Sequence, residues 1–231
     1  GGSFVALQTQ IIPLVGVAIY SVASIAGQTA TSLWVDRMGL TGGGPKPISR
    51  RRVAAAAVTV LAVLVSVLDR IDARDLSMLA VIGAFLAGAF VGVQRALNGQ
   101  INEHSGQSFT TSLFNFTTGT TFLVIVLAIA VASNREELVA LPHGPWWIYT
   151  GGVIGVIYIA FTATIVQHLG VLTFTLFSVG GQLLGSLVID IYSPTNGVRI
   201  STYLVTGIVM TYLGVIVGGV NNSRHRRPQK Q

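Results

Sequence analysis

Long blocks of apolar residues alternate with short polar segments along this chain. Many blocks are about 20 residues long, which is the length a helix needs to cross about 30 Å of hydrocarbon at about 1.5 Å per residue. The alternation over about ten residues that is typical of outer-membrane barrels is not what these blocks show. The pattern therefore predicts an all-α integral membrane protein with several membrane-spanning segments.

The blocks correspond to about seven and a half membrane-spanning segments of about 20 residues. The opening block is about half a span long, ends near Ile12 and is followed by a tight turn at Pro13 and Gly16. Because the chain opens on this half block and not on Met, we expect an N-terminal truncation that cuts through a helix. The first complete segment follows this turn and is expected to end near Trp34. The six further segments are expected to cover 53–68, 77 to beyond 97, 109–132, 146–167, 171–191 and 200–220.

Charge predicts the orientation of the chain. Only 10% of the 231 residues are charged, against about 25% in a typical soluble domain. The loop 36–52 holds five of the 14 Lys and Arg residues and the tail holds four, so the positive-inside rule places both in the cytoplasm. The chain then reaches the outer side after Leu68, near Arg135 and at Asn196, and returns near Glu103 and at His168. The net charge of +6 comes from basic residues in the loops and tail, where the positive-inside rule places them, so we expect no nucleic-acid partner.

Two segments repeat each other. Residues 24–36 read SIAGQTATSLWVD and residues 178–190 read SVGGQLLGSLVID, so that Ser, Gly, Gln, Ser, Leu and Asp match at an offset of 154. The loop after the first copy is assigned inside and the loop after the second outside, which predicts an inverted repeat. Inverted repeats are typical of secondary transporters, whose substrate site lies where the two halves meet.

The repeat predicts how the chain is divided. We expect residues 1–75 to be the C-terminal part of a first repeat and residues 76–220 to be a complete second repeat of five spans, followed by a basic cytoplasmic tail at 221–231. The offset implies that a further segment of about 75 to 80 residues lies upstream. The whole protein would then be a helical bundle of ten spans.

A row of amides marks the first candidate site. Gln94, Asn98 and Asn102 are spaced by four and share one helix face. Amides in hydrocarbon cost free energy unless they are hydrogen-bonded, so the row should face the bundle interior or a water-filled cavity. Gln94 and Asn98 are substrate-path candidates, and we expect Asn115 in the next segment to contact them. Arg95 beside the row is a candidate for gating or coupling.

Hydrogen bonding between helices is the alternative role for these amides. Asn102 and Glu103 are expected at the cytoplasmic surface.

The repeated segments supply the other candidates. Gln28 and Gln182 are repeat mates that could form symmetric polar ledges along the path between the halves, together with Ser186. The alternative is a packing motif, because Gly27, Gly181 and Gly185 permit close approach of backbones. Asp36 and Asp190 lie at helix ends on opposite sides of the membrane. Asp190 is a gating or coupling candidate or a solvated helix end, and His168 is a coupling candidate or a surface-turn histidine.

No pattern in the sequence indicates an enzyme, a metal site or a cofactor. The chain has no Cys, and the run Gly42, Gly43, Gly44 lacks the GK[ST] ending of a P-loop. Transport driven by ATP bound to this chain is therefore not expected, and a proton or solute gradient would supply the energy. The expected partners are membrane lipid and a small-molecule substrate, with a homodimer as a further possibility.

The stretch GVQRALNGQINEHSGQSFTTSLFNFTTG, residues 92–119, resembles a motif of bacterial YdcZ-like inner-membrane proteins. In that family a Gln and an Asn precede a turn and a second helix with an (S/N)-F-x-x-G signature. The GQ…SL…D motif, which occurs here twice, is also similar to that family. Arg95 directly after Gln94 departs from the pattern of that family, because an arginine is unusual at this depth in the membrane. The first half of the chain also lacks its own copy of the Gln/Asn motif.

The resemblance implies a member of the drug/metabolite transporter superfamily, with an inverted fold of five plus five spans in the bacterial cytoplasmic (inner) membrane. We therefore expect an exporter of a small organic solute or metabolite that works by alternating access. The alternative is a non-transporting scaffold subunit that holds a partner through its basic loop. A scaffold would have no cavity between the halves, and its amides would face lipid or be consumed in helix contacts.

Overall fold

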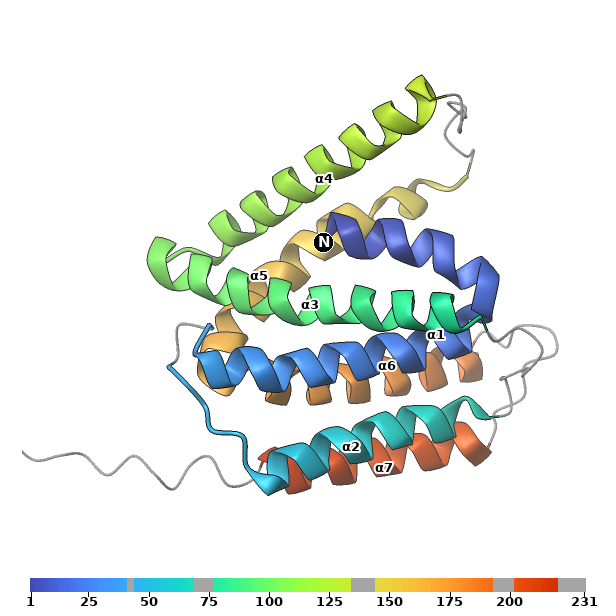
Figure 1. Cartoon of the computed structure of the whole chain (residues 1–231), viewed down its shortest axis with the longest axis vertical. Helices are drawn as coiled ribbons and strands as arrows, with labels where there is room; N and C mark the ends of the chain where they lie inside the picture. The colour runs from blue at the N-terminus through green and yellow to red at the C-terminus, as the bar shows by residue number, and fades with distance from the viewer. Residues whose placement is uncertain (41–43, 69–76, 134–143, 193–201, 220–231) are drawn as a thin grey trace, which may run out of the picture.

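The computed structural model describes residues 1–40, 44–68, 77–133, 144–192 and 202–219, and within them the chain is all-helical. This confirms the prediction of an all-α protein. The predicted charged loop at 69–75, the loop around Arg135, Arg199 and the basic tail lie outside the described residues. The elements are α1 (Gly2–Met38), α2 (Arg50–Ser66), α3 (Met78–Ser105), α4 (Ser108–Ala132), the 3-10 helix η3 (Trp146–Tyr149), α5 (Gly151–Leu169), α6 (Val171–Tyr192) and α7 (Thr202–Gly219) (Figure 1).

Among the described residues, the helices α1, α3, α4 and α5 are long and apolar enough to cross a membrane. Shorter apolar stretches cover Val171–Gly185 in α6 and Thr202–Gly214 in α7. The segment expected at 146–167 begins with the separate helix η3, and α5 starts only at Gly151. The exact number of crossings stays a prediction.

Glycines at two positions reverse the direction of the chain. Gly16 interrupts α1 with φ 77° and ψ 161°, and Pro13 lies just before it. Gly170 separates α5 from α6 with φ 87° and ψ 161°. This region of backbone space is essentially restricted to glycine. Both turns were predicted, and the two glycines are 154 residues apart, which is the offset of the sequence repeat.

The helices lie in layers (Figure 1). From one side to the other, Figure 1 draws α4, then the first segment of α1 (2–15) and α5, then α3, then the second segment of α1 (17–38) beside α6, and then α2 beside α7. Asp36 near the end of α1 contacts Val171 at the start of α6, so these two segments run antiparallel. The helices α2 and α7 are also antiparallel, because Gly207 approaches Ser66 while Gly214 approaches Thr59.

The closest helix contact joins α1 to α3. A Cβ atom on Gly27 would lie 1.9 Å from the carbonyl oxygen of Phe85, and one on Gly88 would lie 1.9 Å from that of Ser24. Only glycine fits at these two positions. In the second copy, Gly181 and Gly185 have no described atom within 4 Å of such a Cβ, so among the described residues this close packing is seen at the first copy.

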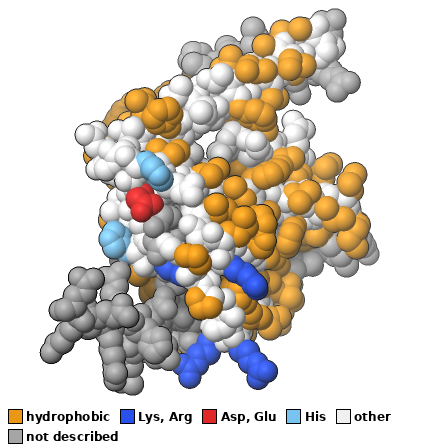
Figure 2. Space-filling view, turned by 60° about the vertical axis from the view of Figure 1, so that its left-hand side comes forward, with side chains coloured by type: hydrophobic (Ala, Val, Ile, Leu, Met, Phe, Trp, Pro, Cys, Tyr) orange, Lys and Arg blue, Asp and Glu red, His pale blue; other side chains and the backbone are white. Residues whose placement is uncertain are grey.

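The outer surface suits a lipid environment. Large apolar side chains such as Phe109, Leu113 and Ile129 of α4 are more than half exposed. Figure 2 shows broad hydrophobic areas, while charged and His side chains gather toward the end that Figure 1 draws at the left. An apolar belt with charges at its end is typical of a membrane-spanning bundle.

Candidate functional site

The polar row of α3 is positioned by well-formed helix ends. Ser77 accepts a hydrogen bond from the backbone N–H of Ala80 at the start, and Gly106 closes the helix with φ 64°. Gln94 Nε2 donates to Asn115 Oδ1 of α4 at 2.7 Å, which confirms the expected contact between the two helices. This bond leaves Gln94 Oε1 and Asn115 Nδ2 available to other groups.

At the far end of the row, Asn102 Nδ2 donates to Gln167 Oε1 of α5 at 3.2 Å. Gln167 Nε2 in turn donates to the carbonyl of Gly99 at 2.8 Å. Asn102 is buried, so its expected place at the surface is wrong, because α5 covers this face of α3. Glu103, one residue further, is exposed as expected.

A cavity of about 310 Å³ lies between α3 and α4, and we call it the amide cavity. Asn98 is 3% exposed, and its Nδ2 has no hydrogen-bond partner among the described residues. An unpaired buried donor costs about 1–3 kcal/mol, so an acceptor that reached Nδ2 would be stabilised at this position. The residues that line the cavity are Gly1, Phe90, Val93, Gln94, Leu97, Asn98, Ile101, Phe114, Asn115 and Thr118.

Arg95 lies about 100° around α3 from Gln94, faces α5 and α6, and is buried, with 6% of its surface exposed. Its Nη1 donates to Thr175 Oγ1 of α6 at 2.8 Å, and its Nη2 donates to the hydroxyl of Tyr158 of α5 at 3.4 Å. The guanidinium lies 5.2 Å from the centre of the Phe174 ring. All of these partners are neutral, and no carboxylate pairs with Arg95 among the described residues.

Thr175 extends this contact to α1. Its hydroxyl oxygen lies 3.1 Å from that of Ser32, and both side chains are fully buried. The result is a polar network of Ser32, Thr175, Arg95 and Tyr158, which joins α1, α3, α5 and α6. Sequence reasoning included Ser32 only as one of the matching residues of the repeated segment 24–36, and it missed Thr175 and Tyr158. A tyrosine in the middle of an apolar block was the available signal for Tyr158.

One helical turn from this network, Asp36 closes the end of the α1–α6 contact. Its carboxylate is fully buried and accepts hydrogen bonds from the backbone N–H groups of Val171 at 2.8 Å and Leu172 at 3.1 Å. It also forms an ion pair with Arg52 at the start of α2. A carboxylate at a helix N-terminus satisfies free N–H groups and interacts favourably with the helix dipole. Asp36 of α1 therefore caps α6, an arrangement that its sequence position did not reveal.

The segment between α1 and α2 completes this arrangement, which we call the Asp36 clasp: Asp36, Arg52, Lys46 and the first turn of α6. Lys46 donates its backbone N–H to the carbonyl of Asp36 at 2.7 Å and its Nζ to the carbonyl of His168 at 3.3 Å. Burial lowers the pKa of Lys46, the Asp36 charge opposes this change, and the Arg52 charge adds to it.

His168 contributes to the clasp through its backbone carbonyl only. Its ring is exposed, and Nδ1 lies 2.9 Å from the carbonyl oxygen of Thr164 in the same helix. The ring lines none of the cavities described here, and its coupling role stays a prediction.

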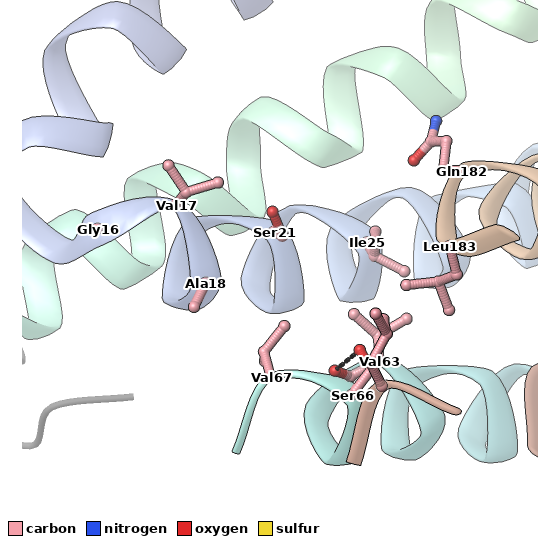
Figure 3. Close-up of a pocket in the computed structure, with 11 residues that line it drawn as sticks. Gly16, Val17, Ala18, Ser21, Ile25, Val63, Ser66, Val67, Gln182 and Leu183 are labelled. Carbon is pink, nitrogen blue, oxygen red and sulfur yellow. Dashed lines mark hydrogen bonds between the residues drawn. The ribbon is translucent and has the colours of Figure 1, made fainter. Parts of the chain in front are cut away.

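A second cavity, of about 400 Å³, lies at the other end of the α1–α6 contact, and we call it the Gly16 cavity. Figure 3 shows residues from α1, α2 and α6 around it, with Leu183 pointing toward Val63. Gln182 lines this cavity and is exposed, whereas its repeat mate Gln28 is buried and donates to Ser24 Oγ at 3.3 Å. The lining residues are Gly16, Val17, Ala18, Ser21, Ile25, Val63, Ser66, Val67, Gln182, Leu183 and Leu204.

Two predicted site residues cannot be placed. Ser186 and Asp190 belong to α6, but their side chains lie outside the described residues. Within the part of the chain that the structure describes, no group of three or more His, Asp or Glu residues could hold a metal ion.

Comparison with known families adds the decisive observation. Residues 1–65 and 79–217 match the family described as "Putative inner membrane exporter, YdcZ". The chain belongs to this family. The match covers nearly the whole sequence, and it confirms the resemblance seen in residues 92–119 and in the repeated motif. The chain is therefore a multi-pass inner membrane protein of a drug/metabolite transporter type. No curated protein sequence matches it significantly.

Proposed function

We propose that this YdcZ-family protein is a secondary-active transporter that exports a small organic solute and binds it at the level of Gln94, Asn98 and Asn115. One observation carries the proposal: a buried Asn98 with an unpaired donor lines a cavity of about 310 Å³. Buried polar groups are usually paired, so an unpaired one that also lines a cavity is a candidate for ligand contact. The exporter family and the apolar outer surface support the same function.

We further propose that the chain contains two inverted copies of one helical unit. The second segment of α1 with α2 would correspond to α6 with α7. Two independent features support this. The mates Gly16 and Gly170 have nearly the same φ and ψ values, and the corresponding helices run antiparallel. Antiparallel copies around a common seam are what alternating access requires, since one copy rocks against the other.

The seam between α1 and α6 supports alternating access in a second way. It is closed at one end by the Asp36 clasp and hollow at the other end, where the Gly16 cavity begins. The positive-inside rule assigns the clasp, with Arg50, Arg51 and Arg52 beside it, to the cytoplasm. In this proposal the described conformation is closed toward the cytoplasm and hollow toward the outside, and the C-terminal tail is cytoplasmic.

The scaffold alternative predicts no cavity between the halves and amides consumed in helix contacts. The Gly16 cavity is lined by residues of α1, α2, α6 and α7, which belong to both proposed copies. Gln182 lines it, and Asn98 is unpaired. These observations favour a transporter.

The test is efflux from proteoliposomes that contain the purified protein and a mixture of small bacterial metabolites. Mass spectrometry of the outer solution should find at least one solute that leaves faster than from protein-free liposomes. Asn98→Leu should abolish this difference, while Gln10→Leu, which removes an exposed amide of α1, should preserve it. Efflux that is the same with and without a pH gradient would exclude proton coupling, and no selective efflux at all would contradict the function.

A further inference from the structure

We propose that the exported solute is an organic anion, whose oxyanion accepts a hydrogen bond from Asn98 and whose charge is offset by Arg95. The inference rests on the proposed transport function and names the substrate class for that site. It starts from a buried positive charge that no described residue balances.

Arg95 is 94% buried in a chain that spans a membrane, and its contacts are two hydroxyl groups and an aromatic ring. Neutral partners satisfy some of the five N–H donors but do not neutralise the charge. Charged residues within membrane bundles normally pair with an opposite charge or mark an ion or substrate pathway. A buried guanidinium without a carboxylate is therefore suited to an anionic ligand.

The described carboxylates cannot serve as its partner. Asp36 is already engaged by Arg52 and by two N–H groups of α6. Glu103 is exposed and follows Arg95 by eight residues, which is about 12 Å along α3.

Asn98 supplies an independent indication of the same ligand chemistry. At about 100° per residue, Asn98 lies on the helix circumference between Gln94, which faces the amide cavity, and Arg95. Its unpaired Nδ2 is a donor, so the missing partner is an acceptor. An oxyanion supplies both an acceptor for Asn98 and the negative charge that Arg95 lacks. The apolar side chains of Phe90, Val93 and Leu97 would contact the organic part of the solute.

The charge of the solute bears on its export. An inside-negative potential of about 100 mV favours outward movement of a monovalent anion by about 50-fold in equilibrium concentration ratio. An anion exporter can thus work with the membrane potential as its energy source.

The test compares benzoate with benzamide, which has the same shape and no charge, as ligands of the purified protein in a neutral detergent. Isothermal titration should show that benzoate binds wild type at least about tenfold more tightly than benzamide, the equivalent of about 1.4 kcal/mol. Arg95→Gln should remove this preference, and Arg95→Lys should retain part of it. Arg51→Gln, which removes an exposed arginine of α2, should leave it unchanged.

A second variant separates binding from folding. Asn98→Asp places a carboxylate three residues from Arg95 on the same helix, within reach of an ion pair. It should abolish benzoate binding and keep or raise the melting temperature. A purely structural Arg95 would give equal binding of benzoate and benzamide in wild type, and this result would overturn the proposal.

A lipid headgroup is another source of an oxyanion. Stabilisation of the protein by phosphatidylglycerol nanodiscs over phosphatidylcholine nanodiscs, without benzoate binding in detergent, would also overturn the proposal that the anion is a solute. Selective efflux of neutral or cationic solutes alone would refute the proposal that the solute is an anion and would leave the transport function intact. Anion binding without any efflux would refute transport.

Discussion

The two ends of the α1–α6 seam carry residues that are repeat mates, but the residues at one end are exposed and those at the other end are buried. At the hollow end Val17 is 64% exposed and Ser21 is partly exposed, whereas their mates Val171 and Thr175 at the clasp end are fully buried. Local sequence therefore does not determine which end is open. At the clasp end the surroundings bury these residues, because the carboxylate of Asp36 caps the helix that begins at Val171.

This difference indicates how the clasp holds the two proposed copies together. Asp36 belongs to the first copy, and the N–H groups that it binds belong to the second. Its ion pair with Arg52 adds α2 to the same contact. The cytoplasmic end is thus closed by a few directional bonds, and a small number of substitutions should be enough to weaken it.

The largest effect is expected for Asp36→Ala. The change leaves two backbone N–H groups without their acceptor and Arg52 without its partner, and breaking a buried pair in this way costs about 3–5 kcal/mol. The melting temperature measured by size-exclusion chromatography after heating should fall strongly. Glu103→Ala removes an exposed carboxylate and serves as the matched control. Equal melting temperatures for the two variants would mean that the clasp does not stabilise the fold.

A smaller effect is expected at the two turn glycines, Gly16 and Gly170. An alanine with positive φ and ψ near 160° is strained by about 1–3 kcal/mol, and this applies to both Gly16→Ala and Gly170→Ala. A Cβ at Gly170 would also lie 2.7 Å from Lys46 Nζ and 3.0 Å from Asp36 Oδ2, while a Cβ at Gly16 has no described atom within 4 Å.

Gly170→Ala should therefore lower the melting temperature more than Gly16→Ala does. The reverse order would contradict the assignment of the closed and hollow ends.

The smallest effect is expected for Ser49→Ala. Ser49 caps α2 locally by accepting from the backbone N–H of Arg52 at 3.3 Å, and loss of such a cap costs about 1 kcal/mol. The comparison with Asp36→Ala asks whether a cap supplied by another helix contributes more than a cap supplied by the same helix. If Ser49→Ala lowered the melting temperature as much as Asp36→Ala does, Asp36 would act only as a helix cap and not as a link between helices.

Much of the fold could be predicted from the sequence, because lipid imposes a simple rule on segment length. The helices followed from the apolar blocks, the turns at Gly16 and Gly170 from glycines at the breaks between blocks, and the contact between Gln94 and Asn115 from the positions of the amides. The surroundings of Asn102 were missed, because the row of amides does not show which neighbouring helix covers it. The repeat predicted similar surroundings for Gln28 and Gln182, but tertiary packing buries only the first.

The central claim is that the two ends of the seam exchange their states during transport. The chain has no cysteine, so Val17→Cys and Val171→Cys place single thiols of similar volume at matched positions. A hydrophilic maleimide should label Val17→Cys quickly and Val171→Cys slowly. Adding Asp36→Asn to each should reverse this order, raising the rate at 171 and lowering it at 17. Equal rates at the outset, or a faster reaction at 171 without a slower one at 17, would contradict the account.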